Sequence, residues 1–334
     1  MSLSFGKVPV DILKEVVFKN IGVKRGEVVL GPSAGIDGAV IDIDKKSLIV
    51  STHPITGAIE RIGWLAVNIN ANDVATFGVA PEFLLSCILL PEKVHKKTVE
   101  IISTQIGKAA KELGIAIVGG HCEVTPGLSN PIVAGCTMGI TDKGNYVTAG
   151  GAKMGDRLIL TKSVGIEGTA ILASDKEEQL KKAINPSIVE KAKDFFNQVS
   201  IVKEAMIAFK IGGVSAMHDP TEGGLAGGVH EMADASNLGV KIFQEKINVQ
   251  PETNEICKFF RIDPLQFISS GALLISAKPE FADKIVKKFE QKQIHASLIG
   301  EFLKKPNDRL LIQKNGEIQT LPRPLSDHLW IALR

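Results

Sequence analysis

Apolar positions along the chain alternate between helical spacing and short continuous runs. Helical spacing predicts helices, and the short runs predict strands. In the first half of the chain, long predicted helices cover 60–78 and 94–113, and predicted strands at 81–90 and 131–140 follow them. Because helices and strands alternate in this way, the sequence predicts an α/β or α+β fold.

The second half of the chain repeats this alternation. It contains predicted strands and helices at 158–161, 169–173, 188–211, 240–243, 251–260, 281–292 and 310–312. Between the halves, residues 141–155 are rich in glycine and weakly patterned. We therefore place a domain boundary there, with one domain over 1–150 and a second over 151–334.

The segment from Met217 to Gly228 reads as a strand end, a turn and the start of a helix. Thr221 is the predicted N-cap of that helix. Four glycines in the opening turns cost about 1 kcal/mol each relative to alanine, which suggests close approach of a backbone or a ligand. Asp219 and Glu222 could hold a divalent cation against a phosphate at such a helix start. A tightly packed helix with two capping acids explains the segment equally well.

Polar residues also interrupt the predicted helix over 60–78, where Asn72 and Asp73 lie in mid-helix. Asn and Asp are mediocre helix formers because their side chains compete for backbone hydrogen bonds. Such local conflicts often mark functional sites. A solvent-facing pair is the alternative explanation, and the sequence pattern does not decide between the two.

Further polar residues stand at the ends of predicted strands. Asp37 follows a glycine-rich turn, His53 ends a strand over 47–52, and His121 follows a strand over 115–120 that we expect to be buried. An acid or an imidazole at a strand end points into the crevice that the sheet makes. Taken alone, however, a turn-stabilising Asp37 and a surface His53 are the simpler explanations.

Composition excludes several classes of protein. The chain has 334 residues, 44% of them hydrophobic and 23% charged, with a net charge of +2 and scattered lysine pairs. This argues against a nucleic-acid groove, which needs clustered basic residues. We also expect no membrane span and no signal peptide. The four cysteines lack CxxC spacing, so we expect buried free thiols in a reducing cytoplasm.

Three acids stand beside glycine-rich or locally disfavoured backbone: Asp37, Asp73 and Asp219. Carboxylates from separate elements suit Mg²⁺, a hard cation that takes oxygen ligands and bridges substrate phosphates. Neither a GxxxxGK[ST] phosphate loop nor a GxGxxG turn is present in the sequence. An ordinary P-loop or Rossmann nucleotide site is therefore disfavoured.

Four motifs in order, at 35–40, 72–81, 119–126 and 218–226, resemble those of the aminoimidazole ribonucleotide (AIR) synthetase superfamily. This superfamily includes thiamine-monophosphate kinase, selenophosphate synthetase and the hydrogenase-maturation protein HypE. The resemblance covers nearly the whole chain and is nearest to the HypE branch. It implies a PurM-like fold with an N-terminal sheet domain that dimerises and a C-terminal α/β domain.

The resemblance also implies a function and its residues. ATP and Mg²⁺ would lie between the domains, and the γ-phosphate would pass to a small-molecule substrate such as an amide. Asp37, Asp73 and Asp219 would hold the metal, with Asp73, Asp219 and Glu222 as the catalytic residues. The expected cofactor-binding residues are Gly35, Asp37, Asn72, Gly119, Gly120, His121, Gly223 and Gly224. The implied partners are a second copy of the chain and maturation proteins.

The sequence departs from the family pattern at several positions. His53, Ile36 and His121 stand where many members carry an acid, and a neutral imidazole is a poor Mg²⁺ ligand. HypE ends in a cysteine that carries the transferred group, whereas the last cysteine here is Cys257. We therefore expect a HypE-like protein with another substrate. The alternative is a catalytically weak or inactive nucleotide-binding dimeric module that acts through protein partners.

Overall fold

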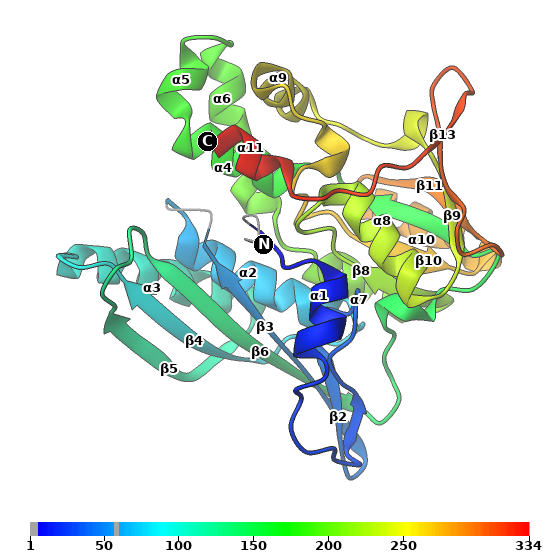
Figure 1. Cartoon of the computed structure of the whole chain (residues 1–334), viewed down its shortest axis with the longest axis horizontal. Coiled ribbons are helices and arrows are strands. Elements are labelled where there is room, and N and C mark those ends of the chain that lie inside the picture. Colours follow the sequence, from blue (N-terminus) through cyan, green and yellow to red (C-terminus); the bar gives the residue numbers. More distant parts are fainter. Residues whose placement is uncertain (1–5, 57–59, 334) are drawn as a thin grey trace.

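The computed structural model describes residues 6–56 and 60–333 and contains two β-sheets, each with its own helices (Figure 1). All strands of the first sheet precede residue 143, and all strands of the second follow residue 156. The predicted mixed α/β fold with two sheet domains is confirmed. Among the described helices, none has the length and apolar character needed to cross a membrane.

The first sheet has six strands in the order β1-β2-β3-β6-β4-β5. The strands and the two helices that pack with them are β1 (Val28–Leu30), β2 (Ala39–Ile43), β3 (Lys46–Ile55), α2 (Ile62–Ala75), β4 (Phe83–Leu90), α3 (Lys96–Leu113), β5 (Ala116–Val124) and β6 (Ile132–Asp142). Only β4 and β5 pair in parallel, because α3 carries the chain across between them. The helices predicted at 60–78 and 94–113 correspond to α2 and α3.

Strand β5 is exposed along its whole length, so the prediction of a buried strand at 115–120 was wrong. An apolar run has the same sequence pattern whether it lies in a core or at a surface. As the edge of the sheet, β5 leaves Ile117, Val118 and Val124 about half exposed (lower left in Figure 1). Cys122 on this strand is exposed as well, against the expectation of four buried thiols.

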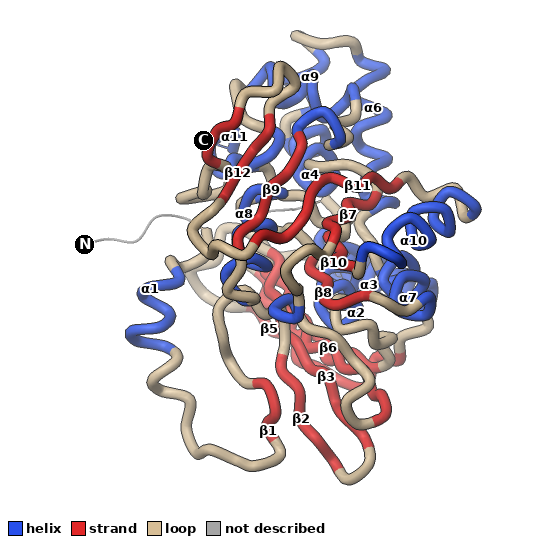
Figure 2. Tube along the Cα trace, turned by 90° about the vertical axis from the view of Figure 1, so that its right-hand side faces the viewer, coloured by secondary structure: helices blue, strands red, loops and turns tan. Residues whose placement is uncertain are grey.

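The second sheet has seven strands in the order β13-β12-β9-β11-β7-β10-β8. They are β7 (Arg157–Thr161), β8 (Val214–His218), β9 (Gly239–Phe243), β10 (Leu274–Ala277), β11 (Ala296–Leu303), β12 (Arg309–Ile312) and β13 (Ile318–Thr320). Figure 2 shows this sheet above the first one, with β8 at its lower edge. The edge strand β8, which ends at His218, therefore lies on the side of the second sheet nearest the N-terminal domain.

Helices cover both faces of the second sheet. Leu158 and Leu160 of β7 pack with α8 (Gly224–Ala235) on one face. Ile159 between them packs on the other face with α7 (Val202–Ile211) and α10 (Pro279–Gln291). Successive side chains of a strand point to opposite faces, so a run that is apolar throughout, such as β7, is buried on both sides.

A further group of helices joins the two domains. It consists of α4 (Ile166–Asp175), α5 (Glu177–Lys181), α6 (Pro186–Lys193), α9 (Pro251–Phe260) and α11 (His328–Leu333). Apolar residues of α2 share one core with α4 and α6, and the Trp64 indole N–H donates to the Phe196 carbonyl at 2.8 Å. Helix α2 is therefore packed between the first sheet and these helices, which fixes its position relative to both domains.

The predicted single helix over 188–211 is broken in the structure. Helix α6 ends at Lys193, a 3₁₀ turn covers Asp194–Gln198, and α7 begins at Val202. Buried polar side chains bind the backbone between them, since Lys162 Nζ donates to the carbonyls of Gln198 and Ser200. These bonds replace the helical ones, and nothing local in the sequence predicts them.

Near the N-terminus, a short α1 (Val10–Ile12) is continued by a π-helical turn over Leu13–Val17. Neither segment contains a buried residue. The sequence pattern did not predict β13 or α11.

Candidate functional site

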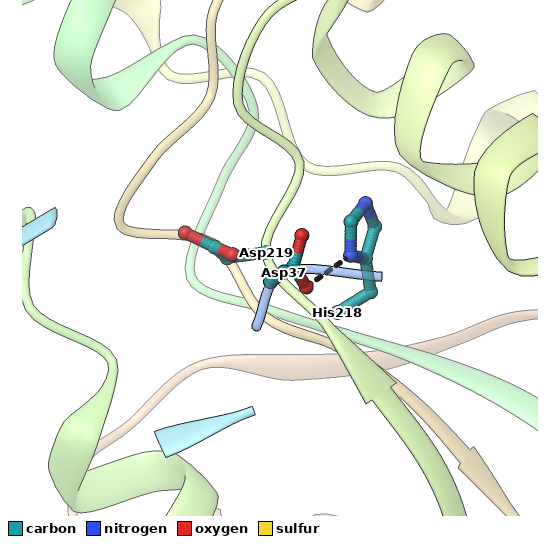
Figure 3. Close-up of side chains that lie close together, drawn as sticks. All are labelled: Asp37, His218 and Asp219. Carbon is teal, nitrogen blue, oxygen red and sulfur yellow. Dashed lines mark hydrogen bonds and ion pairs between the residues drawn. The ribbon is translucent and has the colours of Figure 1, made fainter. Parts of the chain in front are cut away.

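Two of the three predicted metal ligands lie together at the junction of the domains. Asp37 precedes β2 in the N-terminal domain, and Asp219 follows β8 in the C-terminal domain. One ligand atom from each, with one from His218, lie within 4.8 Å of one another. Figure 3 shows the Asp37 carboxylate between Asp219 and the imidazole of His218. Residues from opposite halves of the sequence therefore form one cluster.

Asp73 of α2, the third predicted ligand, is not one of the three residues whose ligand atoms lie within 4.8 Å of one another, but its charge raises the pKa of both Asp37 and Asp219. Its side chain is buried, 4% exposed, although a solvent-facing position was the alternative expectation. The Ser51 hydroxyl lies 2.9 Å from Asp73 Oδ2 and also within hydrogen-bond distance of the Asp37 carbonyl. The disfavoured Asn-Asp pair in mid-helix thus faces the domain junction.

His218 holds Asp37 in place. Its Nδ1 lies 2.7 Å from Asp37 Oδ2, and its Nε2 lies 2.8 Å from Glu231 Oε2 on α8. Burial alone would lower the pKa of His218, but the carboxylates of Asp37 and Glu231 outweigh it and raise the pKa well above 6.5. With both nitrogens protonated, the imidazolium donates to two acids. Lys7 Nζ extends this chain to Glu231 at 2.9 Å.

Because both its ring nitrogens are occupied, His218 is a poor candidate for a metal ligand, even though one of them lies within the cluster. Its role in this structure is to orient Asp37. The atoms left to bind a cation are carboxylate oxygens of Asp37, Asp73 and Asp219, which is the oxygen ligand set that Mg²⁺ prefers.

Asp219 supports this assignment most directly. Both of its carboxylate oxygens are fully buried, and neither has a hydrogen-bond partner among the residues that the structure describes. Burial raises its pKa well above 3.8, and the charges of Asp73 and Asp37 raise it further. A buried carboxylate without a partner costs several kcal/mol, and almost all buried polar groups in native proteins are paired. A divalent cation would supply the missing partner, so the residues fit a metal.

His53 on β3 adds a positive charge beside this cluster. Its Nδ1 lies 3.5 Å from Asp73 Oδ2. Burial lowers its pKa, but Asp73, Asp219 and Glu167 outweigh that effect and raise the pKa to about 9. At neutral pH the side chain is therefore charged and partly neutralises the acids.

Asn72, expected to bind the cofactor, binds the chain itself. Its Nδ2 donates to the Val199 carbonyl at 2.8 Å, and its Oδ1 accepts from the Ile201 amide at 2.9 Å. The side chain is fully buried and uses both of its amide atoms. In this structure Asn72 therefore fixes the C-terminal domain against α2, next to Asp73.

The predicted glycines of the site are explained in part by packing. Gly35 has φ +72°, and a Cβ there would lie 2.8 Å from the Glu231 carbonyl oxygen. Gly224 has φ +60°, and a Cβ would lie 2.6 Å from the Phe267 carbonyl oxygen. Both positions let backbones from different elements approach closely. Gly35 thus lets the Asp37 loop reach α8.

The head of α8 differs from the prediction. The N-cap is Gly223 and not Thr221, and no side chain of the N-cap residue caps the helix. The Gly223 amide donates to Asp327 Oδ2 at 2.7 Å, and the Gly224 amide donates to the Thr221 carbonyl at 3.0 Å. Gly223 and Gly224 were expected to bind the cofactor, but both of their amides are engaged within the chain. Contact with phosphate stays a prediction that would require these bonds to break.

Three predicted cofactor-binding residues on β5 lie apart from the acids of the same chain: Gly119, Gly120 and His121. Through the sheet register, Gly120 lies in line with Ser86, Gly135 and His53. Three strand spacings separate Gly120 from His53, or about 14 Å. His121 is exposed and lies 3.0 Å from Glu123.

Glu222, predicted to be catalytic, lines a pocket of about 50 Å³ between the domains. Its Oε2 accepts the backbone N–H of Lys7 at 2.7 Å. His53 lines the same pocket, which therefore adjoins the acid cluster. A larger groove of about 1010 Å³ between α7 and α10 is lined by none of the predicted site residues.

Sequence reasoning did not assign His218, Glu231 or Glu167 to the site. His218 stands directly before Asp219 at a strand end, a position that could have suggested it. Glu231 lies on α8 and Glu167 on α4. Both are common residue types on helices, and only the tertiary arrangement brings them to the site.

The chain belongs to the AIR synthase related family. The family's N-terminal domain model matches residues 35–141, and its C-terminal domain model matches residues 153–313. The first range contains most of the first sheet with Asp37 and Asp73, and the second contains most of the second sheet with Asp219.

Within this family the chain is similar to proteins of hydrogenase formation. It is 29% identical to a Methanocaldococcus jannaschii protein provisionally named as a hydrogenase expression/formation protein, over 96% of this chain and 95% of that one. It is 28% identical to carbamoyl dehydratase HypE of Rhizobium leguminosarum, over 80% of this chain and 75% of that one. The chain is thus HypE-like.

Solved structures of HypE share the fold. HypE in its complex with HypF superposes with a TM-score of 0.78 at 22% identity, covering 94% of this chain and 99% of that one. HypE in complex with ATP superposes with a TM-score of 0.70 at 22% identity, covering 96% of each chain. At this level of identity the likeness concerns the fold.

Proposed function

We propose that this protein binds ATP with Mg²⁺ at the domain junction and transfers the γ-phosphate to a small molecule. The observation that carries the proposal is Asp219, a fully buried carboxylate without a partner beside two further acids from the other domain. Three acids without a cation repel one another, and a Mg²⁺-bound polyphosphate is a ligand that makes use of them. The fold shared with a HypE–ATP complex supports the nucleotide.

The chain's own residues would act mainly by positioning. Asp37, Asp73 and Asp219 would hold the metal, which when bound neutralises charge on the transferred phosphate. His218 would keep Asp37 oriented through its bond to Glu231. Asp37 and Asp73 belong to one domain and Asp219 to the other, so binding depends on how the domains are held together.

A second copy of the chain would complete the site under this proposal. The exposed edge strand β5 presents apolar Ile117 and Val118 to solvent, and exposed apolar edges commonly pair with another chain. A homodimer formed there would offer Gly119, Gly120 and His121 to a neighbouring subunit. The HypE–HypF complex supports a maturation protein as a further partner.

The alternative is a nucleotide-binding module with weak or no catalysis that acts through protein partners. One observation favours it: His53, whose pKa is raised to about 9, places a positive charge against Asp73, 3.5 Å away. That charge competes with a metal for the same carboxylate. A protein with this site would bind nucleotide but transfer its γ-phosphate slowly.

Calorimetric titration of ATP with and without Mg²⁺, followed by measurement of ADP release, separates these two functions. Phosphoryl transfer requires Mg²⁺-dependent binding and ADP release that increases with a suitable acceptor. Tight binding without turnover across small amides, acids and alcohols would favour the module. Absence of ATP binding in both conditions would refute both functions.

A further inference from the structure

A groove of about 1010 Å³ lies between α7 and α10, on the face of the second sheet opposite α8. Figure 2 shows these two helices side by side on the right of the molecule. The groove shares no lining residue with the pocket at the domain junction. A ligand in the groove would therefore leave the acid cluster free.

The groove is lined by one side of each helix. On α7 the lining residues are Ile207, Lys210 and Ile211, which recur at the spacing of a helical face. On α10 the lining positions recur at the same spacing from Glu280 to Gln291, which is nearly the whole helix. Helix α10 has 13 residues and is about 20 Å long. The groove therefore has the length of a short helix.

The groove is strongly basic. Five exposed lysines line it against two acids, Glu280 and Asp283, so its net charge is +3, whereas the whole chain carries +2. Lys284, Lys288 and Lys292 follow one another at intervals of four residues, and like charges at that spacing destabilise a helix. The five lysines are Lys210, Lys284, Lys287, Lys288 and Lys292.

These five lysines form no ion pair with any acid that the structure describes. On α3, α5 and α9, lysines do pair with acids three or four residues away. On α10 the same spacing separates Glu280 from Lys284 and Asp283 from Lys287, yet neither pair forms an ion pair in the structure. The positive charge of the groove is thus available to an anionic ligand, which would relieve the repulsion between the lysines.

The floor of the groove is apolar. Ile207 and Ile211 pack on the core beneath α7, and their partly exposed sides line the groove one helical turn apart. The methylene groups of the surrounding lysines add to this apolar surface. A ligand that fills the groove must therefore bring apolar groups as well as negative charge.

Both ends of α7 are held in place by hydrogen bonds. The Ile201 amide, just before the helix, donates to Asn72 Oδ1 at 2.9 Å. After the helix, the Gly213 carbonyl accepts from the Lys278 amide at 2.9 Å, which joins it to the start of α10. The groove is therefore formed before any ligand binds, and a preformed site lowers the entropy cost of binding.

The character of the groove fits a helix better than a nucleic acid. Its lining residues include no arginine and no aromatic side chain, the groups that pair with phosphates bidentately and stack on bases. A phosphate backbone would also leave Ile207 and Ile211 without an apolar partner. An amphipathic helix can place apolar side chains on these two residues and acidic side chains against the lysines on both sides.

We propose that the groove between α7 and α10 is a docking site for an acidic amphipathic helix of a partner protein. The apolar face of that helix lies on Ile207 and Ile211, and its carboxylates pair with the five lysines. Docking there needs no nucleotide, so the inference stands apart from the proposed phosphoryl transfer. A partner in the groove can stay bound while ATP enters and leaves the domain junction.

A synthetic peptide tests the docking site. The probe is a fluorescent peptide of about 18 residues of Glu, Ala and Leu, with leucine at i, i+3, i+4 and i+7. A permuted peptide of the same composition scatters the leucines around the helix. In fluorescence anisotropy with the full chain, the ordered peptide should bind roughly tenfold more tightly than the permuted one, or better. Raising the salt from ~50 to ~500 mM should weaken its binding, because salt screens exposed charges.

Two charge-reversal variants locate the binding. Lys287→Glu combined with Lys288→Glu reverses two neighbouring charges on α10. Lys210→Glu combined with Lys284→Glu reverses one charge on each side of the groove. Each variant should weaken binding of the ordered peptide by roughly tenfold or more. Because all four lysines are exposed, both variants should keep the wild-type circular dichroism spectrum.

A matched control separates the groove from the charge of the whole chain. Lys304→Glu combined with Lys305→Glu makes the same change of charge at another exposed lysine pair, on the loop between β11 and β12. This control should bind the ordered peptide as wild type does. Failure of the wild-type protein to bind an ATP analogue would count against the proposed function and not against the docking site.

Equal binding of the ordered and permuted peptides would overturn the inference, because charge alone would then explain the binding. So would an equal loss of affinity in the control variant, or no binding of the ordered peptide at low salt. Tighter binding of duplex DNA or inorganic polyphosphate than of the peptide would also overturn it and would assign the groove to a phosphate polymer.

Discussion

Replacement of Asp219 by asparagine should have opposite effects on stability in the absence and in the presence of the metal-bound nucleotide. Asp219 buries two unpartnered carboxylate oxygens next to Asp37 and Asp73. The asparagine side chain would fill the same space without a charge. In EDTA at pH 8 we therefore expect Asp219→Asn to raise the free energy of unfolding by ~1–3 kcal/mol.

The pH dependence of this gain follows from the sign of the pKa shift. The pKa of Asp219 is raised in the folded state above its ordinary value of 3.8. Below pH 3.8 the Asp219 carboxyl is protonated in both the folded and the unfolded protein, so its burial costs little free energy of folding. As the pH rises, the Asp219 carboxyl ionises at a lower pH in the unfolded protein than in the folded one. The wild-type protein therefore loses stability relative to Asp219→Asn. The gain should be small near pH 4 and grow toward pH 8.

When Mg²⁺ and an ATP analogue are bound, wild type should be more stable than Asp219→Asn. A ligand at a hundred times its Kd stabilises the folded state by about 2.7 kcal/mol. Wild type should gain this from Mg²⁺ with an ATP analogue, and Asp219→Asn should gain little. Urea unfolding followed by circular dichroism at pH 5 and pH 8 measures both effects, with Glu290→Gln as the matched control on an exposed acid of α10.

A different result would refute the reasoning. If Asp219→Asn lost several kcal/mol in EDTA, Asp219 would make a favourable bond in the folded protein, and no ligand would be needed to explain it. If the variant kept the full stabilisation by Mg²⁺ and nucleotide, Asp219 would lie outside the metal site.

Three further predictions concern neighbouring residues. Asp73→Asn should weaken Mg²⁺-dependent nucleotide binding at least tenfold in calorimetry, whereas Glu290→Gln should not change it; equal effects would remove Asp73 from the site. The pKa of His53 is raised from 6.5 to about 9, so its pairing with Asp73 stabilises the fold fully below pH 6.5 and is lost as pH rises through about 9. His53→Asn should therefore cost stability at pH 6 and little at pH 10, and a pH-independent cost in urea unfolding would contradict the pairing. Asn72→Ala removes two buried hydrogen bonds and should cost ~2–4 kcal/mol in urea unfolding; a loss under about 0.5 kcal/mol would mean that these bonds contribute little.

The sequence predicted the elements that its own periodicity defines. The helices at 60–78 and 94–113 and most of the strands lie where the apolar spacing placed them. It failed where distant residues decide the outcome. The helix predicted over 188–211 breaks because Asn72 and Lys162 bind the backbone near 198–201.

The site shows the same division. The mid-helix acid Asp73 and the glycine-flanked Asp219 conflict with local preferences, and that conflict is visible in the sequence. Glu167 and Glu231 break no local rule, since glutamate is a good helix former. Only packing between α4, α8 and the loops shows that one of them lines a pocket with His53 and that the other holds His218. The residues that orient or surround the acids therefore escaped sequence reasoning.

The central claim is that Asp37, Asp73 and Asp219 together hold a metal-bound nucleotide between the domains. A crystal structure with Mg²⁺ and a non-hydrolysable ATP analogue tests it most directly. The account predicts Mg²⁺ at ~2.0–2.1 Å from carboxylate oxygens of these acids and from phosphate oxygens. Nucleotide bound elsewhere, or at the junction with Asp219 still without a partner, would contradict it.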